Sequence, residues 1–275
     1  MKLAGIVVWY NPTKEDKENI YSYLPSLDKL YIFDNSCKKN TYSKNSKIKY
    51  IFNGQNDGIA KALNYGAEKA IKEGYHWLLT MDQDTSFPKE KMEELKKYCQ
   101  LNVEKVGIIC PWLNTKLHVE KPKEEIDYPL DVMTSGNLLN LKVFKKIGGF
   151  KEEFFIDGVD IEYCLRLKKR NFSIMRINKI EVEHNLANIF YKNFFNKELI
   201  CMNHSYMRYY YRIRNYRYIR DLYVDMEPEF CKILVKFKSM LWCIVFYEKN
   251  KWKKIKAMWD GYKDYKKNKT GKYEN

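Results

Sequence analysis

The most informative part of the chain is His76-Trp77-Leu78-Leu79-Thr80-Met81-Asp82-Gln83-Asp84. Its first six residues form a short apolar run, as expected of a buried strand, and two carboxylates follow where that strand would end. Side chains repeat every second residue along a strand, so Asp82 and Asp84 would point the same way. Ligands of α/β sheets bind at the carboxyl ends of the strands, and oxygen ligands suit Mg²⁺ or Mn²⁺. A solvated turn is the alternative, because a chain with 35 acidic residues contains such pairs by chance.

The surrounding sequence alternates short apolar runs with segments of helical period. Strands are expected at 4–10, 30–34, 49–53, 106–111, 132–141 and 172–177, and helices at 14–27, 59–71, 89–101, 143–147 and 157–170. Such alternation is typical of βαβ units around a parallel sheet. The expected fold class is therefore α/β with a mostly parallel central sheet.

Composition limits the class of protein further. The chain has 275 residues, of which 45% are hydrophobic, enough for a sizeable core. Its seven cysteines are odd in number and form no Cys-x-x-Cys pair, which favours reduced thiols and a cytoplasmic location. The apolar run at 4–10 stops at Asn11-Pro12, so it is interpreted as a first strand and not as a signal peptide.

Positive charge is concentrated at the end of the chain. Residues 191–275 hold 20 Lys and Arg against 9 Asp and Glu, together with 20 of the 43 aromatic residues. We therefore divide the chain into an α/β domain, residues 1–195, and a helical, basic and aromatic region, residues 196–275. This composition suits an anionic lipid surface or nucleic acid. The apolar segment 230–247 is interrupted by lysines and is too short for a bilayer span, so it predicts an interfacial helix or a homodimer contact.

Acidic residues recur where the first strands should end. Asp34 closes the second expected strand, and Asn56-Asp57-Gly58 lies between the third strand and its helix. With Asp82 they would share one edge of a parallel sheet, where a nucleotide with its metal needs several acceptors. Each acid alone could also be a turn or helix-capping residue. No Gly-x-Gly-x-x-Gly or Walker loop is present, so neither a dinucleotide dehydrogenase nor a P-loop enzyme is indicated.

Seven motifs in order resemble the inverting family-two glycosyltransferases with a GT-A fold, especially their bacterial rhamnosyltransferase-like branch. They are Val7-Val8-Trp9-Tyr10-Asn11-Pro12, Phe33-Asp34-Asn35-Ser36, the segment 56–66, Leu79-Thr80-Met81-Asp82-Gln83-Asp84-Thr85, Thr134-Ser135-Gly136, Gly148-Gly149-Phe150 and the segment 155–166. The resemblance covers roughly residues 3–215. A basic, tyrosine-rich stretch, Arg208-Tyr209-Tyr210-Tyr211-Arg212-Ile213-Arg214-Asn215, is similar to a signature of the same branch.

The resemblance implies a role for each candidate residue. Donor contacts are implied for Asn11, Asp34, Asp57, Gly58 and Asp82, and a Mn²⁺ or Mg²⁺ site for Asp82, Asp84 and His184. Asp160 is the implied catalytic base, with Asp157 as the alternative. Contacts with the acceptor or a diphosphate are implied for Ser135, Gly136, Asp157, Arg166, Arg208 and Arg214.

The implied activity is transfer of a sugar from a dTDP- or UDP-linked donor to a lipid-linked glycan acceptor in surface-polysaccharide synthesis. Rhamnose is the first expectation for that sugar, and a UDP-hexose or UDP-galactofuranose donor is the alternative. The basic aromatic end would hold the enzyme on the inner face of the cell membrane. The competing class is a non-catalytic protein that binds nucleic acid or membrane through this end. The acidic edge would repel nucleic-acid phosphates, so no nucleic-acid partner is expected.

Overall fold

The computed structural model describes residues 2–101, 103–115, 117, 119–184, 189–194 and 197–274. The chain forms two compact units. The first consists of Met1–Lys151 with Tyr163–Asn185, and the second of Glu152–Glu162 with Leu186–Asn275. A short segment in the middle of the sequence thus belongs with the C-terminal third.

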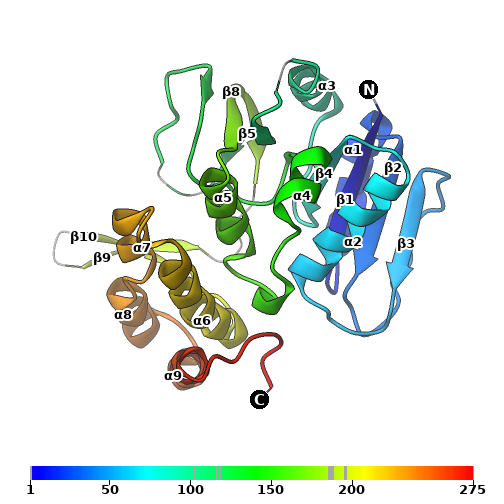
Figure 1. The fold of residues 1–275 in the computed structure, drawn as a ribbon. Helices are drawn as coiled ribbons and strands as arrows, with labels where there is room; N and C mark the ends of the chain where they lie inside the picture. Colours follow the sequence, from blue (N-terminus) through cyan, green and yellow to red (C-terminus); the bar gives the residue numbers. More distant parts are fainter. Residues whose placement is uncertain are drawn as a thin grey trace. The chain divides into compact units, whose positions relative to one another are not determined.

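One sheet organises the first unit. It contains β1 (Leu3–Trp9), β2 (Lys29–Asp34), β3 (Ile48–Phe52), β4 (Trp77–Asp82), β5 (Val106–Asn114), β6 (Ile126–Asp127), β7 (Asn137–Asn140) and β8 (Ser173–Glu183). The strand order is β3-β2-β1-β4-β7-β5-β8-β6 (Figure 1). Only β6 and β7 pair antiparallel with their neighbours in this sheet. The predicted α/β class with a mostly parallel sheet is confirmed.

Alternate residues of the central strands pack on opposite faces of the sheet. Leu3 and Val7 of β1 belong to a core cluster with residues of α1 (Lys14–Tyr23) and α3 (Lys89–Tyr98). Ile6 points the other way, because a Cβ on Gly66 of α2 (Ile59–Lys72) would lie 2.8 Å from it. Helices therefore cover both faces, as a sheet of buried parallel strands requires.

The first four strands end level with one another. In the register of the sheet Trp9 lies opposite Asp34, Val8 opposite Asp82, and Asp34 opposite Phe52. Because these strands are parallel, their carboxyl ends form one edge, and the residues that follow them gather there. The expected convergence of Asp34 and Asp82 on one edge is confirmed.

Several predicted boundaries were wrong. The strand expected over 132–141 is only β7, and Ser135 and Gly136 precede it. The helix expected from 157 is α5 (Val159–Lys169), because Asp157 and Gly158 have positive φ angles of 58° and 84°, which no α-helix can contain. The strand expected over 172–177 continues to Glu183.

The second unit is mainly helical, with strands that the sequence did not predict. Its elements are η2 (Glu152–Phe154), β9 (Phe190–Phe194), β10 (Lys197–Cys201), α6 (Tyr206–Tyr223), α7 (Pro228–Leu234), α8 (Lys238–Tyr247) and α9 (Lys251–Lys266). β9 and β10 pair antiparallel, so the region expected to be helical from residue 196 begins with a strand. Within the described ranges, every helix is too short or too polar to cross a bilayer.

A buried amide joins two distant parts of the first unit. The Asn64 side chain on α2 accepts a hydrogen bond from the Phe150 N–H at 2.7 Å and donates to the Phe150 carbonyl at 2.9 Å. It thereby pairs with one peptide as a neighbouring strand would. Gly149 must lack a side chain here, since its Cβ would lie 2.6 Å from the Asn64 oxygen.

We predict that Asn64→Ala lowers the free energy of unfolding by about 1–3 kcal/mol or more, because the buried Phe150 peptide loses both partners. Urea unfolding of the full chain measures this loss. Glu68→Ala, an exposed position on the same helix, is the matched control and should stay within about 0.5 kcal/mol of wild type. Equal stability of the two variants would contradict the role given to Asn64.

Candidate functional site

A tight turn brings the carboxylates of Asp82 and Asp84 together. β4 ends at Asp82, and the Thr85 N–H donates to the Asp82 carbonyl at 3.4 Å across Gln83 and Asp84. The expectation that Asp82 and Asp84 converge by alternation along a strand was therefore wrong. The turn after β4 directs both side chains into the same space, and alternation along an extended strand does not.

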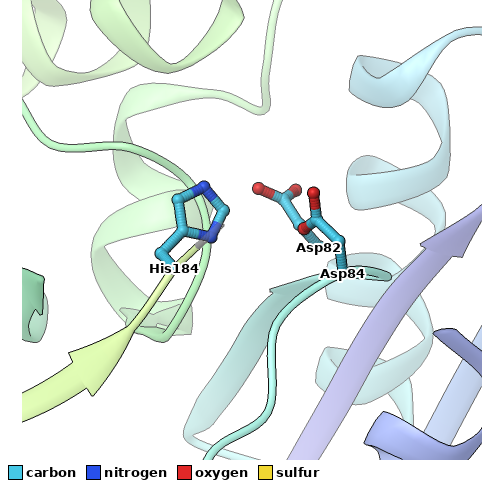
Figure 2. A group of neighbouring side chains, drawn as sticks. All are labelled: Asp82, Asp84 and His184. Atoms are coloured by element: carbon cyan, nitrogen blue, oxygen red, sulfur yellow. The ribbon is translucent and has the colours of Figure 1, made fainter. Parts of the chain in front are cut away.

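His184 completes a cluster with these carboxylates. One ligand atom from each of Asp82, Asp84 and His184 lies within 4.8 Å of the others, and all three residues belong to the first unit. Figure 2 shows the imidazole facing the two carboxyl groups. His184 follows β8, one hundred residues beyond Asp84. Its backbone N–H donates to the Asn114 carbonyl at 3.0 Å. Pairing of β8 with β5 therefore carries it to the cluster.

Thr85 orients the imidazole. Its hydroxyl is hydrogen-bonded to His184 Nδ1 at 2.6 Å, and both side chains are buried. A partner on one ring nitrogen fixes the ring and leaves the other nitrogen for a ligand. Asp82 is half-buried and Asp84 exposed, so the cluster is open to solvent. Two carboxylates and one imidazole are a donor set that fits Mn²⁺ or Mg²⁺.

Gln83 anchors the turn and was missed by the sequence analysis. Its side-chain oxygen accepts from the Tyr10 N–H at 2.7 Å, and its amide nitrogen donates to Asp16 at 3.2 Å. The Asn19 side chain donates to the Gln83 carbonyl at 3.0 Å. The turn is thus fixed to the end of β1 and to α1. A glutamine between two acids has no local pattern that predicts its partners, so the sequence did not indicate that Gln83 anchors the turn.

Asp34 lies at the same edge but is fully buried. Its carboxylate accepts hydrogen bonds from the Ser36 N–H at 2.9 Å, from the Asn40 side chain at 2.9 Å and from the Tyr50 hydroxyl. Burial alone would raise the pKa of Asp34, but these hydrogen bonds outweigh it and lower the pKa below its usual value. The residue is therefore a charged acceptor that holds the loop after β2.

Asn11, Asp57 and Gly58 shape the neighbouring loops. The Asp57 carboxylate accepts from Asn53 and from Gln55 and pairs with Lys61 at 3.2 Å. Gly58 has a φ of 84°, which favours glycine, and its carbonyl accepts from the Asn35 side chain at 3.1 Å. Asn11 is exposed, with its N–H donated to Ser36 at 2.7 Å. The donor-binding roles implied for these residues remain predictions.

Ser135 and Gly136 lie directly against the end of β4. The Ser135 hydroxyl accepts from the Asp82 N–H at 3.2 Å, and the Gly136 N–H donates to the Thr80 carbonyl at 2.9 Å. Gly136 has a φ of 77°. Both residues therefore support the cluster of Asp82, Asp84 and His184, and their contact with the acceptor or a diphosphate stays a prediction.

Arg166 has a structural task in the first unit. Its guanidinium donates to the carbonyls of Ile147, Gly148 and Gly149, at 3.2, 3.1 and 2.7 Å. These groups follow the end of α4 (Leu141–Ile147), where carbonyls lack helical partners. Its predicted contact with acceptor or diphosphate stays a prediction.

The remaining candidates belong to the second unit. Asp160 is half-buried in the first turn of α5, and its carboxylate accepts from the Ile161 N–H at 2.9 Å. Asp157 is bound by both its oxygens to Arg208, at 2.6 and 3.1 Å. Arg214 is fully buried and donates to the carbonyls of Gly271 and Glu153. Asp157 was expected to begin this helix but precedes α5, whereas Asp160 lies in its first turn.

Comparison with known proteins agrees with this fold. Residues 30–124 match the model of Glycosyl transferase family 2. The dTDP-rhamnosyl transferase RfbF of Shigella flexneri is 27% identical over 243 residues, 78% of each chain. The low-salt glycan biosynthesis hexosyltransferase Agl10 of Haloferax volcanii is 25% identical over 212 residues, 66% of this chain and 67% of that one.

Two solved structures share the fold at low sequence identity. GalNAc-T7, solved with UDP, GalNAc and Mn²⁺, has a TM-score of 0.61 and 12% identity; the match covers 97% of this chain and 56% of that one. TarS 1-349 of S. aureus, in complex with UDP-GlcNAc, has a TM-score of 0.59 and 14% identity, with coverage of 95% and 80%. The chain therefore carries a match to the family 2 glycosyltransferase model over residues 30–124 and is similar along most of its length to a rhamnosyltransferase and a hexosyltransferase.

Proposed function

We propose that this protein is a metal-dependent, inverting glycosyltransferase that moves a sugar from a nucleoside-diphosphate donor to a surface-polysaccharide acceptor. The observation that carries the proposal is the convergence of Asp82, Asp84 and His184 at the edge where the parallel strands end. Parallel-sheet proteins bind their ligands at this edge. The mixed oxygen and imidazole donor set supports a divalent cation there.

Each part of the edge has a task in donor binding. Asp82, Asp84 and His184 would hold Mn²⁺ or Mg²⁺. Such an ion, when bound, neutralises charge on a departing diphosphate. Asp34, Asp57, Asn11 and Gly58 would contact the base and ribose. Asp34 already accepts several internal hydrogen bonds. It would therefore serve the donor mainly by fixing the loop after β2 and by its negative charge.

The transfer itself is a single displacement at the anomeric carbon. The acceptor hydroxyl oxygen forms a bond to that carbon while the bond to the diphosphate oxygen breaks, which inverts the configuration. Asp160 takes the hydroxyl proton as general base. Asp157 is less suited, since both its oxygens are engaged by Arg208. The predicted contacts with the acceptor or a diphosphate remain Ser135, Gly136, Arg166, Arg208 and Arg214.

Rhamnose from a dTDP donor is our first choice of sugar, because the relative from Shigella flexneri is named a dTDP-rhamnosyl transferase. A UDP-hexose or UDP-galactofuranose donor is the second candidate, and the hexosyltransferase relative favours a hexose. Thermal shifts of the full chain with Mn²⁺ and dTDP or UDP separate them, since a ligand raises the melting temperature by binding the native state.

We further propose that the enzyme works in the cytoplasm, on the inner face of the cell membrane, where it meets a lipid-linked glycan acceptor. The exposed aromatic residues of α8 and α9 support this location: Trp242, Phe246, Trp252 and Trp259 are 44–80% exposed. On α9, Trp252, Lys256, Trp259 and Lys263 share one side at helical spacing. Aromatic rings with lysines suit an anionic lipid interface. All seven cysteines are free, as a reducing compartment favours.

We expect Asp84→Asn to weaken Mn²⁺ binding by at least about tenfold and to reduce donor turnover accordingly. Thr85→Val should weaken Mn²⁺ binding by about 10- to 100-fold through loss of the His184 partner. Calorimetric titration with Mn²⁺, and turnover after chelation and re-addition of metal, measure both effects. Glu90→Gln, an exposed acid on α3, is the control and should bind as wild type does. Full metal-dependent turnover in Asp84→Asn would remove Asp84 from the site.

Asp160→Asn should lower kcat by about 10²- to 10⁴-fold, because the acceptor hydroxyl loses its general base. The thermal shift produced by nucleoside diphosphate and Mn²⁺ should stay as in wild type. Asp157→Asn should retain more activity, since an amide oxygen still accepts from Arg208. The opposite ranking of the two variants would make Asp157 the base.

The double substitution of Trp252 and Trp259 by alanine should lower partition onto vesicles of phosphatidylcholine with phosphatidylglycerol by about tenfold or more, because two large rings leave the interface. Vesicle co-sedimentation measures this. Tyr128→Ala removes an exposed aromatic residue from the first unit and is the control. Unchanged partition would refute the membrane role, and a dimer lost only in the double variant would make this surface a subunit contact.

A further inference from the structure

The segment that leads to Asp160 has an unusual backbone. Phe155 and Asp157 have φ angles of 65° and 58°, and Gly158 has 84°. Residues other than glycine rarely adopt this region, so such a backbone persists only where its surroundings hold it. α5 begins directly after it, at Val159. Whatever holds residues 153–158 therefore also sets the position of Asp160.

One buried amide of α6 holds three carbonyls of this segment. The Asn215 side-chain nitrogen donates to the carbonyls of Phe154 at 2.9 Å, Ile156 at 2.9 Å and Asp157 at 2.8 Å. Asn215 is fully buried. The three carbonyls share the two hydrogens of this NH₂ group, and the Phe154 carbonyl also accepts from the Ile156 N–H at 2.7 Å. The shared amide helps to fix the path of the chain on both sides of Phe155, because a carbonyl that turned away would lose this donor.

Other side chains of α6 extend this hold in both directions. Arg208 binds the Asp157 carboxylate, and the Tyr211 ring stacks on Phe155 with centroids 5.1 Å apart. Tyr223 donates its hydroxyl at 2.7 Å to Glu162, a fully buried carboxylate in the first turn of α5. The positions 208, 211, 215, 219 and 223 recur at three or four residues, so they form one stripe of the helix. Ile219 of this stripe lies against Gly158, where a Cβ would approach it to 2.9 Å.

We propose that Asn215 and Tyr223 are positioning residues for the transfer reaction: they hold the strained 153–158 segment and the first turn of α5, and thereby Asp160. The inference rests on the proposed function, in which Asp160 is the general base. It gives the tyrosine- and arginine-rich sequence of α6 a geometric purpose. Arg214 shares that purpose, since it donates to the Glu153 carbonyl at 3.1 Å.

The test uses the full chain with Asn215→Ala and Tyr223→Phe. Tyr218→Phe is the matched control, because it removes one hydroxyl from the same helix. That hydroxyl donates to the backbone carbonyls of Lys269 at 3.0 Å and Tyr265 at 3.4 Å, outside the strained segment. Arg208 is avoided because its side chain is 42% exposed and is itself a predicted substrate contact.

Two readouts are needed. Steady-state kinetics should show kcat lowered about 10- to 100-fold in Asn215→Ala and about 3- to 10-fold in Tyr223→Phe, with the donor KM within about twofold of wild type, since misplacement by about 1 Å can cost 10²-fold. Hydrogen exchange should show faster exchange in residues 153–162, including the Glu162 N–H that donates to the Gly158 carbonyl at 2.9 Å. Tyr218→Phe should change neither.

Unchanged kcat in both variants overturns the proposal, and so does an equal loss in Tyr218→Phe or a rise in donor KM without a fall in kcat. If Asn215→Ala fails to fold, Tyr223→Phe decides alone, because it removes a single oxygen. Exchange data separate this inference from the proposed function. If the two variants exchange faster at residues 153–162 but the wild-type protein transfers no sugar, the proposed function is refuted. If the wild-type protein is active but the two variants exchange at the wild-type rate, the positioning role is refuted.

Discussion

The level ending of four parallel strands is the constraint on which the candidate donor and metal site depends. Because β1 to β4 stop within one residue of each other in the register, the loops after them meet at one edge. Polar side chains that would otherwise be isolated turn residues then become neighbours. Gln83 ties the turn after β4 to the end of β1, and Asn35 links the loops after β2 and β3. The cluster of Asp82, Asp84 and His184 is built on this edge.

Much of this arrangement was predictable from the sequence. Apolar runs bounded by acids predicted the strands of the first half correctly. Asp34 and Asp82 share an edge because parallel strands leave no other choice. His184 came only from the resemblance to a family, since a histidine one hundred residues away carries no local signal of its partners.

Other features depend on three-dimensional context that no local pattern encodes. The turn at 83–84 replaced an expected continuation of the strand, because hydrogen bonds from Tyr10 and Asn19 to Gln83 decide the backbone there. The start of α5 moved from 157 to 159 because left-handed residues at 155, 157 and 158 are stabilised by α6, about 60 residues later. Arg214 is fully buried and donates to the Glu153 carbonyl, a structural contact that the sequence did not indicate. Long-range contacts override local preference at each of these places.

The Asn64–Phe150 link has a consequence for the order in which the chain folds during synthesis. β1, α1, β2, β3, α2 and β4 follow each other in sequence and pair as near neighbours, so they can assemble as they emerge, N-terminal parts first. Asn64 cannot find its partner until Phe150 has been made, and His184 cannot join Asp82 until β8 has paired with β5. The acidic cluster is thus among the last features of the first unit to form. A nascent chain would gain its imidazole ligand only after the sheet is nearly complete.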